Sequence, residues 1–323
     1  MLDEILFPIK AELGEVDSIL STQVKSNVAL INDALQYITK NIGKRIRPAV
    51  FLLSAKMLGN VNKEMLYLAC VFELIHTASL LHDDVIDDAD LRRGKPSVKA
   101  RWGNQISILL GDFLWCKSSE FFMAYGSKEL WGKVINVVSD ITEGQIKELT
   151  CLNNIELDED GYMDIIKGKT AALFQVCAQG AAIEQKLSQQ FVDALQQYGF
   201  NLGMAFQLKD DILDYVSDDD LLGKRVGNDL KEGKLTLPII YTLKQCDKNQ
   251  AIKIKEFLIS RQISSSQFKD VRDIINNYEG LKSTQELAIS YIAKAKSYLS
   301  IFKPCLEKDT LSRLADYVVK REV

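Results

Sequence analysis

Prolines are scarce in this chain, which has only five among its 323 residues. Because proline ends or kinks an α-helix, their scarcity leaves room for long helices. Strand-like alternation is equally rare, whereas apolar residues recur at helical spacing almost everywhere. We therefore expect an all-α fold and, since no Gly/Ser-rich linker divides the chain, a single domain over residues 1–323.

Histidines and paired cysteines are scarce too. Only two histidines occur, His76 and His82. They are too few for an HD-type metal phosphohydrolase, which the pair His82-Asp83 would otherwise suggest. The six cysteines include no C-x-x-C pair, and most lie among apolar residues. We expect buried, reduced thiols, which fit a cytoplasmic location.

An excess of basic residues and a long apolar run are both missing. The net charge is −4, so we expect no nucleic-acid partner, which would call for a basic surface. No segment reaches about 18 uninterrupted apolar residues, so we expect no transmembrane segment. The N-terminus is amphipathic and carries acidic residues, which argues against a signal peptide.

Aspartates, by contrast, gather where an apolar helix is expected to end. The stretch LLHDDVIDDADLRRGKPS, Leu80–Ser97, has five aspartates within eight residues. Asp83 and Asp87 lie four residues apart and so share a helix face, with Ser79 and His76 on the same stripe. Carboxylates are unfavourable at the C-terminal end of a helix, so this cluster calls for a cation.

A second cluster with the same spacing follows in FQLKDDILDY, residues 206–215. Asp210 and Asp214 are one turn apart, with Gln207 and Asp211 beside them. Magnesium takes one or two carboxylates together with substrate phosphates, so two such clusters on facing helices would hold Mg²⁺ against a phosphorylated ligand. The spacing of an EF-hand calcium loop is absent. A solvated acidic helix end would explain one cluster better than two.

Basic residues accompany both clusters. Guanidinium groups match phosphate oxygens in pairs, and lysine adds a point charge. Each alone is more often a solvated surface charge, but together they predict a cage with enough positive charge for two anionic ligands. The residues are Lys44, Arg45 and Arg47 in GKRIRP, Arg92 and Arg93 in LRRGKP, Lys169 beside Thr170 in GKTA, and Lys224 and Arg225 in LGKRVG.

In order and spacing these motifs resemble those of the trans-type isoprenyl diphosphate synthases, the polyprenyl synthetase family. GKRIRP, LIHTASLLHDDVIDDADLRRGKP, GKTAALF, FQLKDDILDY and GKRVGNDLKEGKLTLP carry the resemblance, most strongly over residues 41–238. The chain departs mildly at Asn41-Ile42, where members often carry glycines. The resemblance implies an all-α helical bundle of the isoprenoid synthase type around a deep central cavity, working as a homodimer.

The resemblance also implies roles for the matching residues. Those expected to act in catalysis are Asp83, Asp84, Asp87, Arg92, Lys169, Thr170, Gln207, Asp210 and Lys224. Isopentenyl diphosphate would be bound by Lys44, Arg47, His76 and Arg93, and the allylic diphosphate by Arg92, Lys169 and Lys224. The expected ligands of about two or three Mg²⁺ ions are Asp83, Asp87, Asp210, Asp211 and Asp214.

The reaction implied is head-to-tail prenyl transfer. The allylic C–O bond ionises, the isopentenyl double bond attacks the cation, and a proton is lost. Metal ions and cationic side chains would stabilise the charge on the leaving diphosphate. Thr170 and Gln207 would steady the reacting carbon, and the departing diphosphate would take the proton. For His76, a structural role in the core is the alternative.

Small residues near the first cluster predict a long product. Ala78 and Ser79 lie about one turn below Asp83, where a large side chain would plug the cavity. A helix from Glu64 to Asp83 rises about 28 Å, the length of roughly six to eight isoprene units. We expect a product of about C40, within about C30–C50, built on a primer such as farnesyl diphosphate. The tail would be delivered to a membrane, for example as a quinone side chain.

Several other functions compete with this one. A terpene cyclase would usually replace the second aspartate cluster with an Asn/Ser/Glu-type triad. A non-catalytic subunit of a heteromeric synthase would tend to lose aspartates, and both clusters are intact here. A short-chain farnesyl or geranylgeranyl diphosphate synthase stays open, because the sequence does not fix the product length. An acidic helical scaffold would not need the ordered basic motifs.

Overall fold

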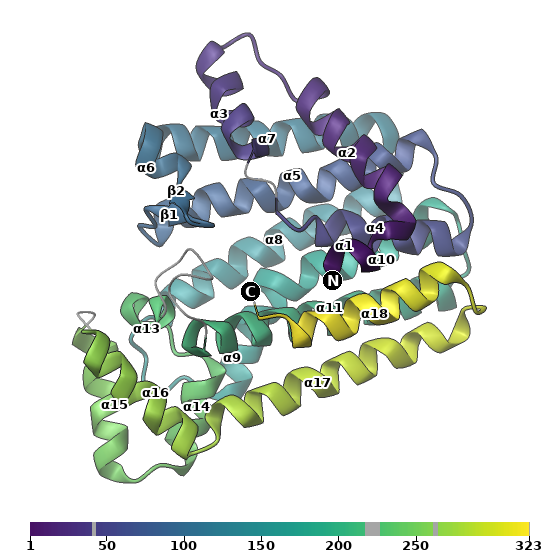
Figure 1. Ribbon diagram of the computed structural model, residues 1–323. Coiled ribbons are helices and arrows are strands. Elements are labelled where there is room, and N and C mark those ends of the chain that lie inside the picture. Colours follow the sequence, from purple (N-terminus) through teal and green to yellow (C-terminus); the bar gives the residue numbers. More distant parts are fainter. Residues whose placement is uncertain (41–42, 217–226, 261–263, 323) are drawn as a thin grey trace. The chain divides into compact units, whose positions relative to one another are not determined.

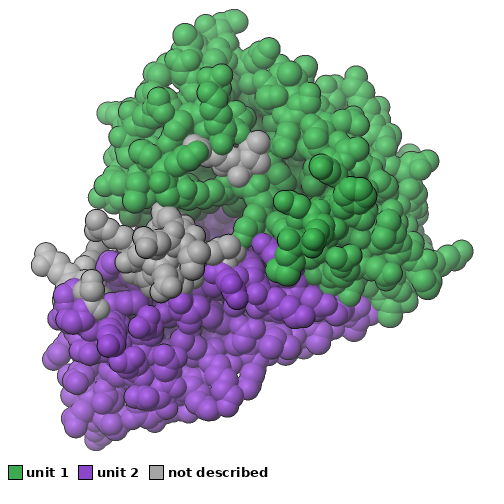
Figure 2. Space-filling model, viewed as in Figure 1, with its two compact units in different colours: residues 1–135, 174–199, 298–314 green, residues 136–173, 200–297, 315–323 purple. Residues whose placement is uncertain are grey.

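The computed structural model describes residues 1–40, 43–216, 227–260 and 264–322, and their secondary structure is almost entirely helical (Figure 1). The all-α prediction is confirmed. The chain divides into two compact units (Figure 2). Unit 1 comprises Met1–Ile135, Phe174–Gly199 and Tyr298–Leu314, and unit 2 comprises Asn136–Leu173, Phe200–Ser297 and Ala315–Val323. The single domain stays a prediction.

Unit 1 is built around two long helices, α5 and α7, which run side by side (Figure 1). Its elements up to residue 125 are α1 Leu2–Ile5, η1 Phe7–Ile9, α2 Lys10–Gln23, α3 Ala29–Lys40, α4 Ile46–Leu58, α5 Lys63–Ile86, β1 Leu91–Arg92, β2 Lys95–Pro96, α6 Val98–Trp102 and α7 Asn104–Tyr125. Residues of α8 Lys128–Thr150, α10 Ala172–Glu184, α11 Gln189–Val216, η3 Leu299–Ile301 and α18 Leu306–Lys320 complete it.

Helix α5 forms the core of unit 1. The side chain of Asn62 caps its start by accepting the N–H of Met65 at 3.0 Å. Apolar side chains of α5 point to most sides of the helix, as expected for a helix buried on most sides. In the described part of the chain it is the one helix long and apolar enough to cross a membrane, but 67% of its apolar window is buried inside the fold. This burial is that of a core helix.

Between α5 and α6 the chain forms a hairpin where the sequence predicts only a loop. Strands β1 and β2 are antiparallel and two residues long, too short to show alternation. Arg93 and Gly94 between them have positive φ, 54° and 72°, as in a type I′ turn. The hairpin thereby places Arg92 in a strand and Arg93 in the turn.

Unit 2 contains mostly the later helices. Its elements include parts of α8, α11 and α18, with α9 Glu159–Ile166, the π-helical turn η2 Lys167–Ala171, α13 Asn228–Glu232, α14 Leu237–Gln245, α15 Lys248–Ser260, α16 Ser265–Asn277 and α17 Gly280–Tyr298. Asp158 caps α9 by accepting the N–H of Gly161 at 2.9 Å. An ion pair of 2.9 Å between Lys296 and Asp316 joins α17 to α18.

The π-helical turn η2 lies close to α8 because both carry a glycine at the crossing. A Cβ on Gly168 would lie 2.7 Å from the carbonyl oxygen of Asp140, and one on Gly144 would lie 2.7 Å from the amide nitrogen of Lys169. Either substitution would force the two backbones apart. Since π-turns are often found at functional sites, the position of Lys169 and Thr170 on this one is informative.

Candidate active site

The first aspartate cluster lies at the C-terminal end of α5, in unit 1. Asp83 is in the last helical turn and Asp87 is the C-cap, and both are half-buried. Their four-residue spacing near the helix end keeps them on one face with Ser79. The hydroxyl of Ser79 donates to the carbonyl of His76 at 2.9 Å. The predicted stripe along α5 is therefore present.

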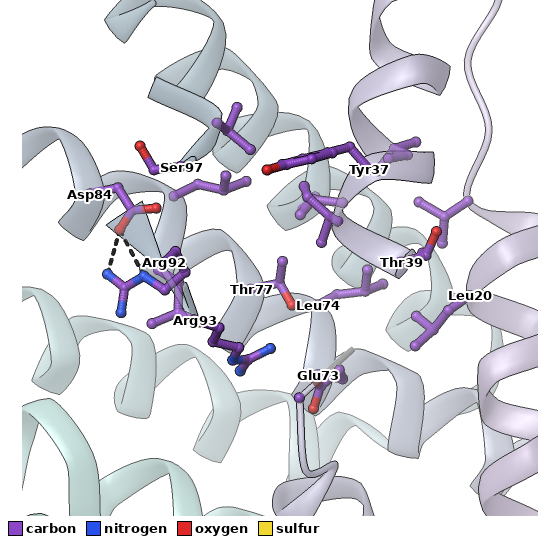
Figure 3. A pocket seen from close by; sticks show the side chains of 18 of the residues that line it. Leu20, Tyr37, Thr39, Glu73, Leu74, Thr77, Asp84, Arg92, Arg93 and Ser97 are labelled. Carbon is purple, nitrogen blue, oxygen red and sulfur yellow. Dashed lines mark hydrogen bonds and ion pairs between the residues drawn. The ribbon is translucent and has the colours of Figure 1, made fainter. Parts of the chain in front are cut away.

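The other aspartates of this stretch have structural partners. Asp84 is only 3% exposed and accepts from Arg92, through Nε at 2.8 Å and through Nη2 (Figure 3). Asp88 and Asp90 both pair with Lys99 of α6. Asp84 thus fixes Arg92 on the hairpin, and its predicted part in catalysis stays a prediction.

Arginines of GKRIRP and the hairpin gather beside α5. Arg45, with φ of 51°, precedes α4 and donates to Asp17 at 2.9 Å and to Glu73 at 2.5 Å. The guanidinium carbon of Arg47 lies 4.6 Å from the centre of the Phe174 ring. Two carboxylates therefore hold Arg45, a residue to which the sequence assigned no partner.

Gly43 makes room for Arg93. A Cβ on Gly43 would overlap Nη2 of Arg93, so a larger residue at this position of GKRIRP would displace the Arg93 guanidinium. Lys44, next in sequence, is exposed. The glycine thus brings the arginine of the hairpin turn to the loop that precedes α4.

Burial and these arginines together lower the pKa of His76. Burial lowers its pKa well below the usual value, and the positive charges of Arg47, Arg93 and Arg92 lower it further. Burial also lowers the pKa of Arg93 itself. A neutral imidazole among guanidinium groups can donate one hydrogen bond to an anion without adding charge. This part of unit 1 is suited to a strongly negative ligand.

A pocket of about 100 Å³ adjoins this group in unit 1 (Figure 3). Apolar side chains such as Leu20 and Leu74 line most of it, while Glu73, Arg93 and the Asp84–Arg92 pair form its polar wall. The α5 residues at this pocket lie on a different face from His76, Ser79 and Asp83.

The second aspartate cluster lies on α11, in unit 2, and its members differ in environment. Asp210 has a side chain 42% exposed and forms an ion pair with Arg321. Arg321 also donates to the carbonyl of Phe206 at 3.2 Å and covers its ring at 4.2 Å.

Asp214 and Asp211 accept hydrogen bonds from other groups of the protein. The two oxygens of Asp214 accept the backbone N–H groups of Asn228 and Asp229, at 3.2 and 3.1 Å, and so fix the start of α13. Asp211 is 3% exposed and accepts from Gln207 at 2.8 Å and from the phenol of Tyr162. Burial raises the pKa of Asp211 to about 7, while the hydrogen bonds from Tyr162 and Gln207 oppose this shift.

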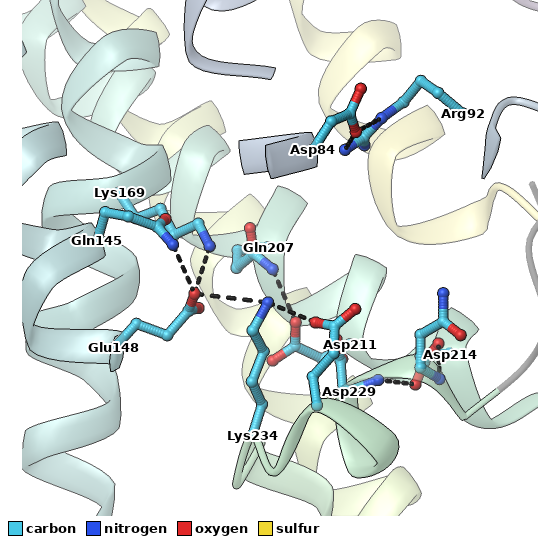
Figure 4. Close-up of polar contacts among 12 residues, drawn as sticks. Asp84, Arg92, Gln145, Glu148, Lys169, Gln207, Asp211, Asp214, Asp229 and Lys234 are labelled. Carbon is cyan, nitrogen blue, oxygen red and sulfur yellow. Dashed lines mark hydrogen bonds and ion pairs between the residues drawn. The ribbon is translucent and has the colours of Figure 1, made fainter. Parts of the chain in front are cut away.

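Lys169 pairs with Glu148, which the motifs do not include, whereas Lys234 and Gln207 of the same network belong to the motifs (Figure 4). Lys169 donates to Glu148 at 2.6 Å, and Lys234 lies 3.6 Å from the same carboxylate. The hydroxyl of Thr170 donates to Gln207 at 2.7 Å. Lys147 and Glu148 are neighbours in QIKELT, and Lys234 follows Glu232 by two residues in EGKL, but the pairing of Glu148 with Lys169 and Lys234 is long-range.

A second pocket, of about 90 Å³, lies in unit 2 beside this network, and the side chains that line it there are mainly polar. The lining residues that matter here are Glu148, Tyr162, Lys169, Gln207, Asp211, Asp229 and Lys234. The predicted ligand Lys224, with Arg225, lies outside the described residues. The first cluster belongs to unit 1 and the second to unit 2, so the prediction that they face one another stays a prediction.

The carboxylates fit magnesium held jointly with a substrate. In the part of the chain that the structure describes, no group of three or more His, Cys, Asp and Glu side chains could hold a metal by itself. Mg²⁺ does not require such a group, because it keeps several waters and shares phosphate oxygens. Asp83 with Asp87, and the partly exposed Asp210, supply one or two carboxylates each, which fits this kind of site.

Comparison with known proteins identifies the family. A family model described as Polyprenyl synthetase matches residues 28–275. Octaprenyl diphosphate synthase of Escherichia coli (strain K12) is 35% identical over 311 residues, 96% of this chain and 96% of the relative. Short chain isoprenyl diphosphate synthase of Methanothermobacter thermautotrophicus is 37% identical over 287 residues, 87% of each.

A solved structure supports the same conclusion. Polyprenyl synthase from Caulobacter crescentus, complexed with calcium and isoprenyl diphosphate, has a TM-score of 0.96 and 33% identity, covering 100% of this chain and 98% of that one. The chain belongs to the polyprenyl synthetase family. It is a trans-prenyltransferase of the class that acts on isopentenyl and allylic diphosphates. The relatives differ in product length, so membership does not fix this property.

Proposed function

We propose that the protein makes a long-chain all-trans polyprenyl diphosphate of about C40 by adding isopentenyl diphosphate units to an allylic primer such as farnesyl diphosphate. One observation carries this proposal. Helix α5 ends in the half-buried carboxylates of Asp83 and Asp87. Beside them lies a group of arginines around a neutral His76. Carboxylates for a metal and cations for an anion are thereby combined on one helix end.

Mg²⁺ fits these carboxylates and would be held by Asp83, Asp87 and Asp210. When bound, it would supply charge stabilisation for the departing diphosphate. Support comes from the Caulobacter crescentus enzyme, whose structure contains calcium and an isoprenyl diphosphate. Asp211 and Asp214 are weaker candidates as ligands, because both oxygens of each accept hydrogen bonds from protein groups. Asp210 accepts from Arg321 at Oδ1 and keeps a side chain that is 42% exposed.

The protein's own cations would bind both diphosphates. Arg92, fixed by Asp84, and Lys169, fixed by Glu148, would hold the allylic diphosphate in a set geometry. Lys44, Arg47 and Arg93 would bind isopentenyl diphosphate, with a hydrogen bond from His76. Because His76 is surrounded by positive charge, it is a poor proton acceptor, and the departing diphosphate would take the proton.

Product length would be set along α5. Ala78 and Ser79 have small side chains about one turn below Asp83, so neither would block a chain that grows past Asp83. The similarity to octaprenyl diphosphate synthase supports about C40, within about C30–C50. A short-chain farnesyl or geranylgeranyl product is the second candidate, because a short-chain synthase is 37% identical to this chain.

We also propose a cytoplasmic homodimer that delivers its product to a membrane. Helix α7 exposes Ile108, Leu109 and Met123, at 42%, 62% and 75% of their surfaces, and a second copy would cover such a face. The lipid tail of the product is insoluble in water, so a membrane is its expected destination, for example for a quinone side chain.

The test is product analysis with the purified protein. Isopentenyl diphosphate, farnesyl diphosphate and Mg²⁺ are supplied, and the products are sized by mass spectrometry. We expect chains of about C40, with none formed in the presence of a chelator. Products that stop at a short chain would select the second candidate, and failure to extend any primer would refute the proposal.

A further inference from the structure

A chain of three hydrogen bonds runs through unit 2, from α9 to the π-helical turn. The phenol of Tyr162 donates to Oδ2 of Asp211, and Nε2 of Gln207 donates to Oδ1 of the same carboxylate at 2.8 Å. The hydroxyl of Thr170 then donates to Oε1 of Gln207 at 2.7 Å. Gln207 and Asp211 are four residues apart on α11, so they share one face (Figure 4).

The donors and acceptors along this series of hydrogen bonds set its direction. Nε2 of Gln207 donates to Oδ1 of Asp211, so the amide of Gln207 turns its NH₂ group toward Asp211. The carbonyl oxygen of Gln207 then faces Thr170, and the single hydroxyl proton of Thr170 is used on it. Any further group that meets this hydroxyl oxygen meets lone pairs rather than a proton.

Tyr162 keeps the buried end in place. Asp211 and Tyr162 are each only 3% exposed, so water cannot supply hydrogen bonds to the carboxylate or to the phenol. Burial and the charge of Asp211 raise the pKa of the Tyr162 phenol well above its usual value, so the phenol stays a donor. Without Tyr162, one carboxylate oxygen would be left buried without its donor, at considerable cost.

We propose that Tyr162 and Asp211 are positioning residues that orient Gln207 so that Thr170 presents an oxygen lone pair to the electron-poor allylic carbon of the substrate. The inference rests on the proposed function and on the role that the family resemblance implies for Thr170 and Gln207, which would steady the reacting carbon. A proton in place of that lone pair would point positive charge at a developing cation. The orientation therefore matters for the ionisation step rather than for substrate binding.

A double-mutant cycle tests this role. Thr170→Val removes the hydroxyl with little change of shape, and Asp211→Asn replaces one of the two accepting oxygens with a donor. We expect each single variant to lower the single-turnover rate about 10- to 100-fold. Asp211→Asn in the Thr170→Val background should cost no more than about twofold.

Magnesium dependence separates this role from metal binding. If Asp211 acts as a metal ligand instead, Asp211→Asn raises the half-saturating Mg²⁺ concentration and its effect multiplies with that of Thr170→Val. Either result overturns the inference. Unchanged half-saturation with a non-additive cycle supports it.

A milder variant guards against misfolding. Tyr162→Phe should lower the turnover rate about tenfold with the KM for isopentenyl diphosphate unchanged. Tyr198→Phe is the matched control, because the buried Tyr198 phenol donates to the carbonyl of Leu311 at 2.9 Å, away from this chain. The control should lose comparable stability but little activity. Equal losses of activity in both variants would defeat the inference. A wild-type protein that forms no product would instead defeat the proposed function.

Discussion

The two aspartate clusters share the spacing D-D-x-x-D but differ in their electrostatic surroundings. In unit 1, Asp83 and Asp87 end a helix beside a group of arginines, and burial together with the charge of these arginines lowers the pKa of His76. In unit 2, burial raises the pKa of Asp211 and Asp229, and the charges of neighbouring aspartates raise it further. Among the described residues, the surroundings of His76 in unit 1 therefore favour an anion, whereas the aspartates of unit 2 disfavour one another's charge. The same motif serves two purposes because its neighbours differ.

The largest effect is expected from removing a carboxylate of unit 1. Asp83→Ala should lower kcat/KM by about a thousandfold or more, because Asp83 is proposed to hold the metal at the leaving group. Asp88→Asn is the control, since Asp88 only pairs with Lys99 and asparagine tolerates its positive φ of 52°. Steady-state kinetics with saturating Mg²⁺ measures both. Near-normal turnover of the Asp83 variant would remove the metal assignment.

Removing a cation from unit 1 should affect binding of one substrate. Arg93→Gln should raise the KM for isopentenyl diphosphate about 10- to 100-fold, with a smaller change in kcat, because a bidentate charged contact is lost. Arg101→Gln serves as the control, because Arg101 stacks on Tyr37 and Trp102 instead. If the KM for the allylic substrate rises instead, the two binding roles have been exchanged.

A change on α5 that spares both clusters should alter product length alone. Ser79→Phe should shorten the main product, because its ring would occupy the space one turn below Asp83. Ser79→Ala keeps the side chain small and should leave the product distribution unchanged. Mass spectrometry of the extracted products compares the two. Unshortened chains from the phenylalanine variant would show that α5 does not set the length.

A smaller effect is expected where unit 2 supplies its own cation. Arg321→Gln frees Asp210 from its ion pair, so the half-saturating Mg²⁺ concentration should fall about threefold. Thermal stability should fall as well, because Arg321 is buried against Phe206. Lys320→Gln, one residue earlier and exposed, should change neither. A rise in the Mg²⁺ requirement would mean that Arg321 assists the metal rather than replacing it.

The smallest effect concerns pH. The folded state lowers the pKa of His76, so below about pH 6.5 the unfolded chain takes up a proton that the folded chain excludes. Stability should therefore fall as the pH falls from about 6.5, and His76→Gln should flatten this slope. Denaturant unfolding at several pH values measures it, with His82→Gln as the control. The same slope in wild type and His76→Gln would contradict the assigned charge surroundings.

The sequence predicts the helices and the residue types of the site better than its pairings. Helix α5 and the stripe of His76, Ser79 and Asp83 follow from spacing alone, because helical periodicity is local. The partners Glu148 and Tyr162 could not be predicted, since they come from segments distant in sequence and carry no motif. Lys234 lies in a quoted motif, but its pairing with Glu148 is long-range.

Two details of the backbone could not be predicted from the sequence either. The hairpin at Arg92 is too short to show alternation, and the π-helical turn at Thr170 depends on a crossing of Gly144 and Gly168. Asp84 illustrates the remaining gap. Its place in the motif suggests a metal, whereas its burial and its bond to Arg92 could only be seen in the fold.

Helix α5 also restricts how such an enzyme can diversify. It carries the carboxylates at one end and, as proposed, the wall that limits the growing chain. Inserting one residue between them would turn Asp83 by about 100° around the axis and misalign it with His76. New product lengths are therefore more accessible by exchanging single side chains along the helix than by lengthening it. Sequence drift within α5 should consequently favour substitutions over insertions and deletions.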